Sequence, residues 1–210
     1  MTSDVFKKHF PDLSNDQIEQ LKGFGEVIEY WNDKINVISR KDIDNIFPHH
    51  ILHSLFIKKV IQFKDGAKVL DVGTGGGFPG IPLAICFPNV KFHLVDARAK
   101  KIMVVQEVID HLKLKNVVAE HKVVQEVKTQ YDFVVTRAVA KIETLMGWCR
   151  PRISPEHIHS IPNGVIALKG GTIRDLKNEV PKGEYAEQHA ISDWTDIEHY
   201  SEKYVIYIQA

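Results

Sequence analysis

The chain has 210 residues, of which 44% are hydrophobic and 26% are charged, and its 27 basic and 27 acidic side chains give a formal net charge of zero at pH 7. This length and composition are typical of one globular domain with an extension and are sufficient to bury a sizeable core. The zero net charge excludes binding of nucleic acid through overall charge, so any basic surface must be local.

Cysteine content and the amino-terminal sequence predict the compartment. Cys86 and Cys149 do not have the spacing of a metal-binding pair, which favours free thiols in a reducing compartment. Residues 1–10, MTSDVFKKHF, lack the apolar core of a signal peptide. The sequence has no uncharged apolar run approaching the ~20 residues that span a bilayer. We therefore expect a soluble, cytoplasmic protein without a membrane segment.

A capping signal and an apolar period predict a long helix near the amino terminus. Ser14 and Gln17 have the spacing of a capping box. Apolar residues then recur at steps of three and four, namely Ile18, Leu21, Phe24, Ile28 and Trp31. This period predicts an amphipathic helix over residues 15–32.

A second helical region is expected before the main domain. Asp42 is placed to cap it, and Pro48 should interrupt it. The Asp-Gly pair at residues 65–66 is a turn signal that leads into the first strand. The sequence therefore predicts an N-terminal helical extension of residues 1–65, followed by one compact domain of residues 66–210.

From residue 68 onward, strand and helix patterns alternate. The predicted strands are residues 68–72, 91–95, 117–120, 131–136, 164–168, 185–191 and 204–209. The predicted helices between them are residues 79–86, 98–112, 141–149 and 172–180. Such alternation implies a parallel sheet with right-handed crossovers. We expect an α/β, Rossmann-like domain with a mostly parallel seven-stranded sheet.

The stretch of residues 68–82, KVLDVGTGGGFPGIP, combines a buried strand, a glycine turn and a helix start. Asp71 lies at the end of the strand, and four glycines follow at positions 73 and 75–77. Glycines reach positive φ and allow a ligand to approach the backbone, while Pro79 suits a first helical turn. Open α/β sheets bind nucleotide-like ligands at such a place.

The glycine spacing discriminates between ligands. A dinucleotide site needs a third glycine where Phe78 stands, and no Gly-Lys-Ser/Thr follows to make a phosphate loop. The spacing Gly73, Gly75, Gly77 after Asp71 instead resembles motif I of the class I S-adenosylmethionine-dependent methyltransferases. A tight turn without a ligand is the alternative.

Asp96 ends the second strand, 23 residues after Gly73. Its carboxylate has the acceptor sites to bind both ribose hydroxyls of S-adenosylmethionine. It could also cap the helix that starts near Arg98, and the two roles are compatible.

The longer stretch LDVGTGGGFPGIPLA, residues 70–84, is similar to the signature of the bacterial 16S rRNA guanine-N7 methyltransferases, the RsmG or GidB family. Further patterns that resemble the family's are Trp31-Asn32 with Asn36, His50 with His53-Ser54-Leu55, Val95-Asp96-Ala97 with Lys100-Lys101, Thr136-Arg137-Ala138, and Lys169-Gly170. Two positions depart from the family's pattern. His53 stands where Asp is usual, and Val124-Gln125 stands where an Ala-Glu pair is common.

The resemblance implies methyl transfer from S-adenosylmethionine to N7 of a guanosine in the 530 loop of 16S rRNA. The substrate would be the small ribosomal subunit or an assembly intermediate, and we expect a monomer. The resemblance implies cofactor contacts at Gly73, Phe78, Val124, Gln125 and Arg137, to which the arguments above add Gly75 and Asp96. We expect RNA contacts at Asn32, Asn36, Lys100, Lys101 and Lys169.

Guanine N7 has a lone pair and no proton, so the implied reaction needs no general base and depends on alignment. Arg137, after the fourth strand, is the predicted catalytic residue in a positioning role. Its planar guanidinium suits an RNA phosphate, a base edge or the cofactor, and a surface salt bridge is the alternative. Phe78 or Trp148 could stack on a base.

Other functions remain to be weighed. His49 and His53 could face a metal, but no third ligand is indicated, so we expect no metal site. The competing functions are a class I methyltransferase for a small molecule or a protein, a non-catalytic nucleotide-binding module, and an NAD-dependent oxidoreductase. Calorimetry with S-adenosylmethionine and NAD separates the last from the others.

Overall fold

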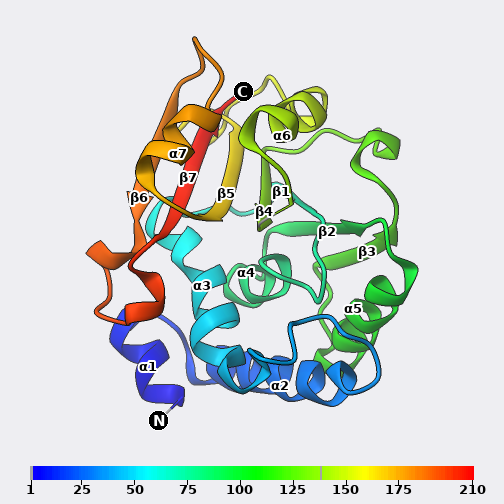
Figure 1. Cartoon of the computed structure of the whole chain (residues 1–210). Coiled ribbons are helices and arrows are strands. Elements are labelled where there is room, and N and C mark those ends of the chain that lie inside the picture. Colours follow the sequence, from blue (N-terminus) through cyan, green and yellow to red (C-terminus); the bar gives the residue numbers. More distant parts are fainter. Residues whose placement is uncertain (1, 138) are drawn as a thin grey trace.

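The computed structural model describes residues 2–137 and 139–210. Its described residues form a seven-stranded sheet in the order β3-β2-β1-β4-β5-β7-β6 (Figure 1). The strands are β1 (Lys68–Val72), β2 (Lys91–Asp96), β3 (Val117–His121), β4 (Phe133–Arg137), β5 (Gly164–Gly170), β6 (Ala186–Ala190) and β7 (Lys203–Gln209). Strands β1 to β5 pair in parallel, and β7 is antiparallel to both β5 and β6. The predicted α/β fold with a mostly parallel seven-stranded sheet is confirmed.

The central strands are apolar on both faces because helices cover both sides of the sheet. Strands β1, β4 and β5 are buried along most of their length, as expected for parallel strands inside an α/β sheet. The covering helices are α1 (Thr2–His9), α2 (Asn15–Asn32), α3 (Leu52–Leu55), α4 (Gly80–Cys86), α5 (Ala99–Leu112), α6 (Ile142–Cys149) and α7 (Ile173–Glu179). Helices α2, α4 and α5 share one hydrophobic cluster with one face of the sheet, and α6 and α7 share a second cluster with the other face (Figure 1).

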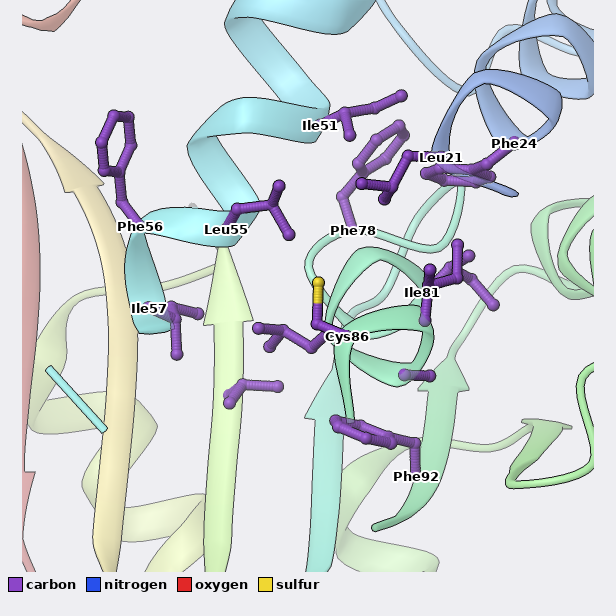
Figure 2. Packing of buried hydrophobic residues seen from close by; sticks show 14 of the residues in the cluster. Leu21, Phe24, Ile51, Leu55, Phe56, Ile57, Phe78, Ile81, Cys86 and Phe92 are labelled. Carbon is purple, nitrogen blue, oxygen red and sulfur yellow. The ribbon is translucent and has the colours of Figure 1, made fainter. Parts of the chain in front are cut away.

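The first 65 residues pack onto α4 and α5 of the sheet domain. Gln17 completes the predicted capping box, with its backbone N–H 3.1 Å from Ser14 Oγ and its Oε1 3.0 Å from the Ser14 N–H. Its amide nitrogen also donates to the carbonyls of Ile85 and Cys86 at the end of α4. Figure 2 shows side chains of α2 and α3 facing α4 in this shared cluster. The division of the chain at residue 65 stays a prediction.

The region between α2 and β1 differs from the prediction. A helical path runs through η1 (Ile43–Asn45), η2 (Ile46–Ile51), α3 and η3 (Phe56–Lys59), so the expected interruption at Pro48 is wrong. The Asp42 side chain makes no capping hydrogen bond, because its carboxylate is taken by the imidazoles of His49 and His50, each at 2.7 Å.

Element boundaries elsewhere agree with the prediction to within about two residues. Helix α1 was not predicted individually, and Tyr131 lies outside β4 in an isolated bridge to Ile153. Within the described residues, we find no helix with the length and hydropathy needed to cross a membrane.

Candidate cofactor site and the cluster around Arg137

The turn after β1 has a backbone that requires glycine. Gly73, Gly75 and Gly77 have φ values of 67°, 61° and 97°, in the left-handed region that side chains disfavour. The Gly73 and Thr74 N–H groups both donate to the carbonyl oxygen of Val95, at 2.9 and 3.1 Å. The turn is thereby fixed between β1 and the end of β2.

Asp71 stabilises the turn through hydrogen bonds to its carboxylate. Its fully buried Oδ2 accepts hydrogen bonds from the Thr74 hydroxyl at 2.7 Å and from the Gly80 N–H at 2.8 Å. A Cβ on Gly80 would lie 2.6 Å from that oxygen, so glycine is needed where α4 begins. Burial raises the pKa of Asp71 to about 7, although its two hydrogen bonds act in the opposite direction. Asp71 therefore ties the strand end to the helix start.

Asp96 supports the same turn from the neighbouring strand. Its Oδ2 accepts from the Gly75 N–H and its Oδ1 from the Arg98 N–H, each at 2.9 Å. The hydrogen bond from the Arg98 N–H closes a local turn that leads into α5. Arg98 is the N-cap residue of that helix, and its side chain makes no capping hydrogen bond. A carboxylate oxygen can accept more than one hydrogen bond, so the ribose role predicted for Asp96 is compatible with this support.

Side chains from three segments approach the glycines. A Cβ on Gly73 would lie 2.6 Å from Val139 Cγ2, and one on Gly75 would lie 3.7 Å from Lys101 Nζ. A Cβ on Gly76 would lie 3.2 Å from Val37 Cβ. The space beside the turn thus admits backbone contact but no additional side chain at Gly73.

The groups around the turn fit S-adenosylmethionine. The Asp96 carboxylate suits ribose hydroxyls, the Lys101 ammonium suits the carboxylate of an amino-acid tail, and the glycines allow close approach of the ligand. Val124 is 5% exposed and packs in the cluster that contains Val95. The backbone oxygen of exposed Gln125 accepts from Arg152 Nη2 at 2.7 Å. Cofactor contacts at these two residues stay predictions.

Phe78 belongs to the core. Its ring is 2% exposed and lies 4.9 Å from the ring centroid of Phe24 and 5.6 Å from that of His50. Figure 2 shows it among the apolar residues that join α2 to α4. The expectation that its ring could stack on a base is wrong for this arrangement, because the core already covers it. Trp148 is half-buried and packs against the second cluster.

Arg137 ends β4 and lies over Phe78. Its guanidinium carbon is 4.7 Å from the Phe78 ring centroid, and its Nη1 is 3.0 Å from His50 Nδ1. Burial lowers the pKa of Arg137 to about 10, so it remains a cation at neutral pH. In the described part of the chain no carboxylate forms an ion pair with it, so a surface salt bridge is wrong.

The residues predicted to contact RNA differ in their exposure. Asn36 and Lys100 are exposed, and Lys101 is half-buried beside Gly75. Asn32 is 3% exposed, and its Oδ1 accepts from the Val37 and Ile38 N–H groups. Lys169 is 12% exposed and pairs with Glu179 Oε2 at 2.8 Å. Contacts of these residues with RNA stay predictions. The internal hydrogen bonds of Asn32 and the ion pair of Lys169 argue against RNA contacts at those two residues. Ala138 lies outside the described residues.

The histidines near Arg137 form a cluster that was not predicted as a unit. The His49 and His199 rings stack with centroids 3.5 Å apart, and the Tyr200 hydroxyl donates to the Pro48 carbonyl. Across residues 2–137 and 139–210, no group of three or more His, Cys, Asp or Glu side chains is arranged to hold a metal ion. The short spacing of His49, His50 and His53 was the one signal of this cluster in the sequence.

Solved structures with a similar fold include two methyltransferases. Precorrin-6y C5,15-methyltransferase from Geobacter metallireducens matches with a TM-score of 0.54 and 12% identity, covering 84% of this chain and 92% of that one. A SAM dependent methyltransferase from Aquifex aeolicus matches with a TM-score of 0.54 and 16% identity, covering 75% of this chain and 89% of that one. At this identity the similarity shows the fold alone.

Sequence comparison is more specific. The family model described as rRNA small subunit methyltransferase G matches residues 17–192. The "Ribosomal RNA small subunit methyltransferase G" of Flavobacterium johnsoniae is 48% identical over 205 residues, which cover 98% of this chain and 97% of that protein. The protein of the same name from Bacteroides thetaiotaomicron is 47% identical, covering 98% and 99%. The chain therefore belongs to the rRNA small subunit methyltransferase G family.

Proposed function

We propose that this chain methylates N7 of one guanosine in the 530 loop of 16S rRNA with S-adenosylmethionine as methyl donor. Membership of the rRNA small subunit methyltransferase G family supports the rRNA methyltransferase activity. The observation that carries the cofactor assignment is the glycine turn held by Asp71 and Asp96. The enzyme would act as a cytoplasmic monomer on the small ribosomal subunit or on an assembly intermediate.

The cofactor would be held at the carboxyl edge of the sheet. The backbone of Gly73 and Gly75 would contact its amino-acid tail and ribose, and Asp96 would accept from the ribose hydroxyls through its remaining acceptor sites. Val124 and Gln125 follow β3 and would border the adenine. When bound, S-adenosylmethionine supplies an electrophilic methyl group on a positively charged sulfur.

The protein's part in the reaction is alignment. Guanine N7 attacks through an in-plane lone pair and loses no proton, so no side chain has to act as a base. Arg137 is a cation at the end of β4, and β4 pairs with β1, with Thr136 opposite Val72. Its five donors suit the acceptor edge of guanine or an RNA phosphate beside it. Arg137 would thus orient the target without transferring a proton.

The proposal is tested with purified protein, tritiated S-adenosylmethionine and three substrates: deproteinised 16S rRNA, small subunits, and assembly intermediates. The substrates should come from a strain that lacks the protein, so that the target guanosine is unmodified. We expect tritium in one N7-methylguanosine of the 530 loop, located by aniline cleavage and primer extension. Asp96→Ala protein, which should bind the cofactor poorly, is the control.

Each other outcome selects a different function. Methylation of another nucleotide, or of a ribosomal protein, would overturn the assignment of the target. Tight cofactor binding in calorimetry without methylation of any of the three substrates would favour the small-molecule methyltransferase or the non-catalytic module. Binding of NAD in preference to S-adenosylmethionine would favour the oxidoreductase.

A further inference from the structure

Arg137 is a cation in a largely apolar place. It lies on the face of Phe78 and is half-buried, and no carboxylate in the described chain pairs with it directly. Removing a charge from water is costly unless hydrogen bonds and nearby opposite charge compensate. The compensating negative charge therefore comes from carboxylates that do not touch Arg137, and Asp71 contributes more of it than Asp42.

The contact between Arg137 and His50 fixes the state of the imidazole. A guanidinium has only donors, so His50 Nδ1, 3.0 Å from Arg137 Nη1, must accept and carries no proton. The proton of the neutral ring is then on Nε2, which lies 2.7 Å from Asp42 Oδ2 and donates to it. Burial and the Arg137 charge lower the pKa of His50 to about 4, which keeps this neutral form at neutral pH.

Asp42 is itself held in place. Its Oδ1 lies 2.7 Å from His49 Nδ1 and 3.3 Å from Asn45 Nδ2. His49 in turn stacks on His199, from the segment before β7. The carboxylate is therefore fixed by groups from two parts of the chain, and it extends its negative charge toward Arg137 through His50.

The neighbouring His53 takes no part in the hydrogen bonds that link Asp42 to Arg137. Its ring is 6% exposed, and its Nε2 has no hydrogen-bond partner in the described structure. Burial, with Arg137 as the next cause, lowers the pKa of His53 well below its usual value, so the ring is neutral. Asp42 is the carboxylate that reaches Arg137 through hydrogen bonds.

We infer that Asp42 and His50 are positioning residues, which hold the Arg137 guanidinium over Phe78 in the orientation needed for methyl transfer. The inference rests on the proposed function, since it assigns the orientation of Arg137 a role in that reaction. Without His50, the guanidinium would lose its acceptor and could rotate away from its place over Phe78.

Two variants of His50 separate the two hydrogen bonds. In His50→Asn, the amide oxygen can occupy the place of Nδ1 and accept from Arg137, but the side chain is too short to reach Asp42. In His50→Gln, the amide nitrogen can replace Nε2 and donate to Asp42, but Oε1 lies one bond farther from Cβ than Nδ1 did and is displaced from Arg137. We expect methyl transfer to small subunits to fall about 100-fold in His50→Gln and about tenfold in His50→Asn.

Two readouts distinguish positioning from a merely structural role. In an Arg137→Ala background, the His50→Gln substitution should cause no further loss of kcat/KM, because the group it positions is gone. Nitrogen-15 NMR of histidine-labelled wild-type protein should show the Nε2-protonated tautomer at His50, and Arg137→Ala should shift it toward a mixture. Melting temperatures of all variants report on folding.

The inference is overturned by equal losses in His50→Asn and His50→Gln, by additive losses with Arg137→Ala, or by a protonated Nδ1 in the wild-type protein. Failure of the proposed function gives a different result. Wild-type protein would then transfer no methyl group to rRNA, while the tautomer measurement would still decide whether His50 accepts from Arg137.

Discussion

The glycine turn and the cluster around Arg137 are neighbours at the carboxyl edge of the sheet, but they are built differently. The turn consists of consecutive residues 71–80, supported by Asp96 from the next strand. The cluster joins side chains of residues 42–50, the end of β4 and the segment before β7. A local turn depends on backbone conformation, whereas the cluster depends on tertiary packing and on protonation states. Substitutions should therefore impair cofactor binding in the first region and alter pH dependence in the second.

The largest effect is expected at the turn. Gly73→Ala places a Cβ at a φ of 67° and 2.6 Å from Val139 Cγ2, in the turn that we propose to bind the cofactor. The strain costs about 1–2 kcal/mol, and binding of S-adenosylmethionine should fall below detection in calorimetry.

Gly66→Ala is the matched control for this substitution. Gly66 has a φ of 83°, but a Cβ there would meet no atom within 4 Å, and the residue precedes β1 at the opposite edge of the sheet. It should lose only the stability that the positive φ costs and should bind the cofactor normally. Equal cofactor affinity in the two variants would show that the turn is not the binding site.

The cluster should make stability depend on pH. The folded pKa of His50, about 4, lies below its usual 6.5, so the unfolded chain binds more protons between these values. Stability from this group is therefore present above pH 6.5 and is lost as pH falls toward 4, by about 3 kcal/mol in total. Urea unfolding of wild type and His50→Gln across this range should give a smaller slope in the variant.

Other groups contribute to the same titration. The lowered pKa values of His9, His53, His93, His159 and His199 act in the same direction as that of His50. The raised pKa of Asp71 acts in the opposite direction, because its stabilising proton is lost as pH rises toward 7. The comparison is best made in an Asp71→Asn background, since the amide oxygen can still accept from Thr74 and Gly80. Identical slopes in both proteins would mean that His50 is not held neutral.

These two regions also differ in how far the sequence could predict them. The alternation of apolar strands and amphipathic helices is a local pattern, so the seven strands and their boundaries could be read from it. The glycines at 73, 75 and 77 could be assigned to a turn because few other residues adopt positive φ. The place of Asp96 beside the turn could be predicted because it ends the second strand, although its bond to Gly75 could not.

The cluster could not be predicted, because it is made by contacts between distant segments. Asp42 was expected to cap a helix, but two imidazoles seven and eight residues ahead compete for its carboxylate. Phe78 lies in a glycine-rich turn that suggested exposure, yet α2 and η2 cover its ring. Such outcomes depend on which surfaces meet in the folded chain, and a period in the sequence does not encode them.

A smaller effect is expected at Asp96. Asp96→Asn keeps one oxygen acceptor but loses the charge that serves Gly75, Arg98 and, in our proposal, the ribose. Hydrogen bonds to charged groups contribute about 1.5–3 kcal/mol, so cofactor affinity should fall about ten- to a hundredfold. Titration calorimetry measures it, and the melting temperature shows how much of the loss is structural. An unchanged affinity would remove Asp96 from the cofactor site.

The smallest effect is expected at Lys101, which is the point where α5 reaches the turn. Its Nζ lies beside Gly75, at the place where we expect the cofactor carboxylate. An exposed ion pair contributes about 0.2–1 kcal/mol, so Lys101→Ala should weaken S-adenosylmethionine binding by a few-fold. Lys100→Ala, one residue earlier and exposed, is the matched control. It should leave cofactor affinity unchanged and, as a phosphate contact, reduce the salt dependence of small-subunit binding by a slope of about 1. The reverse result would assign Lys101 to the RNA and leave the turn dependent on residues 71–80 and Asp96 alone.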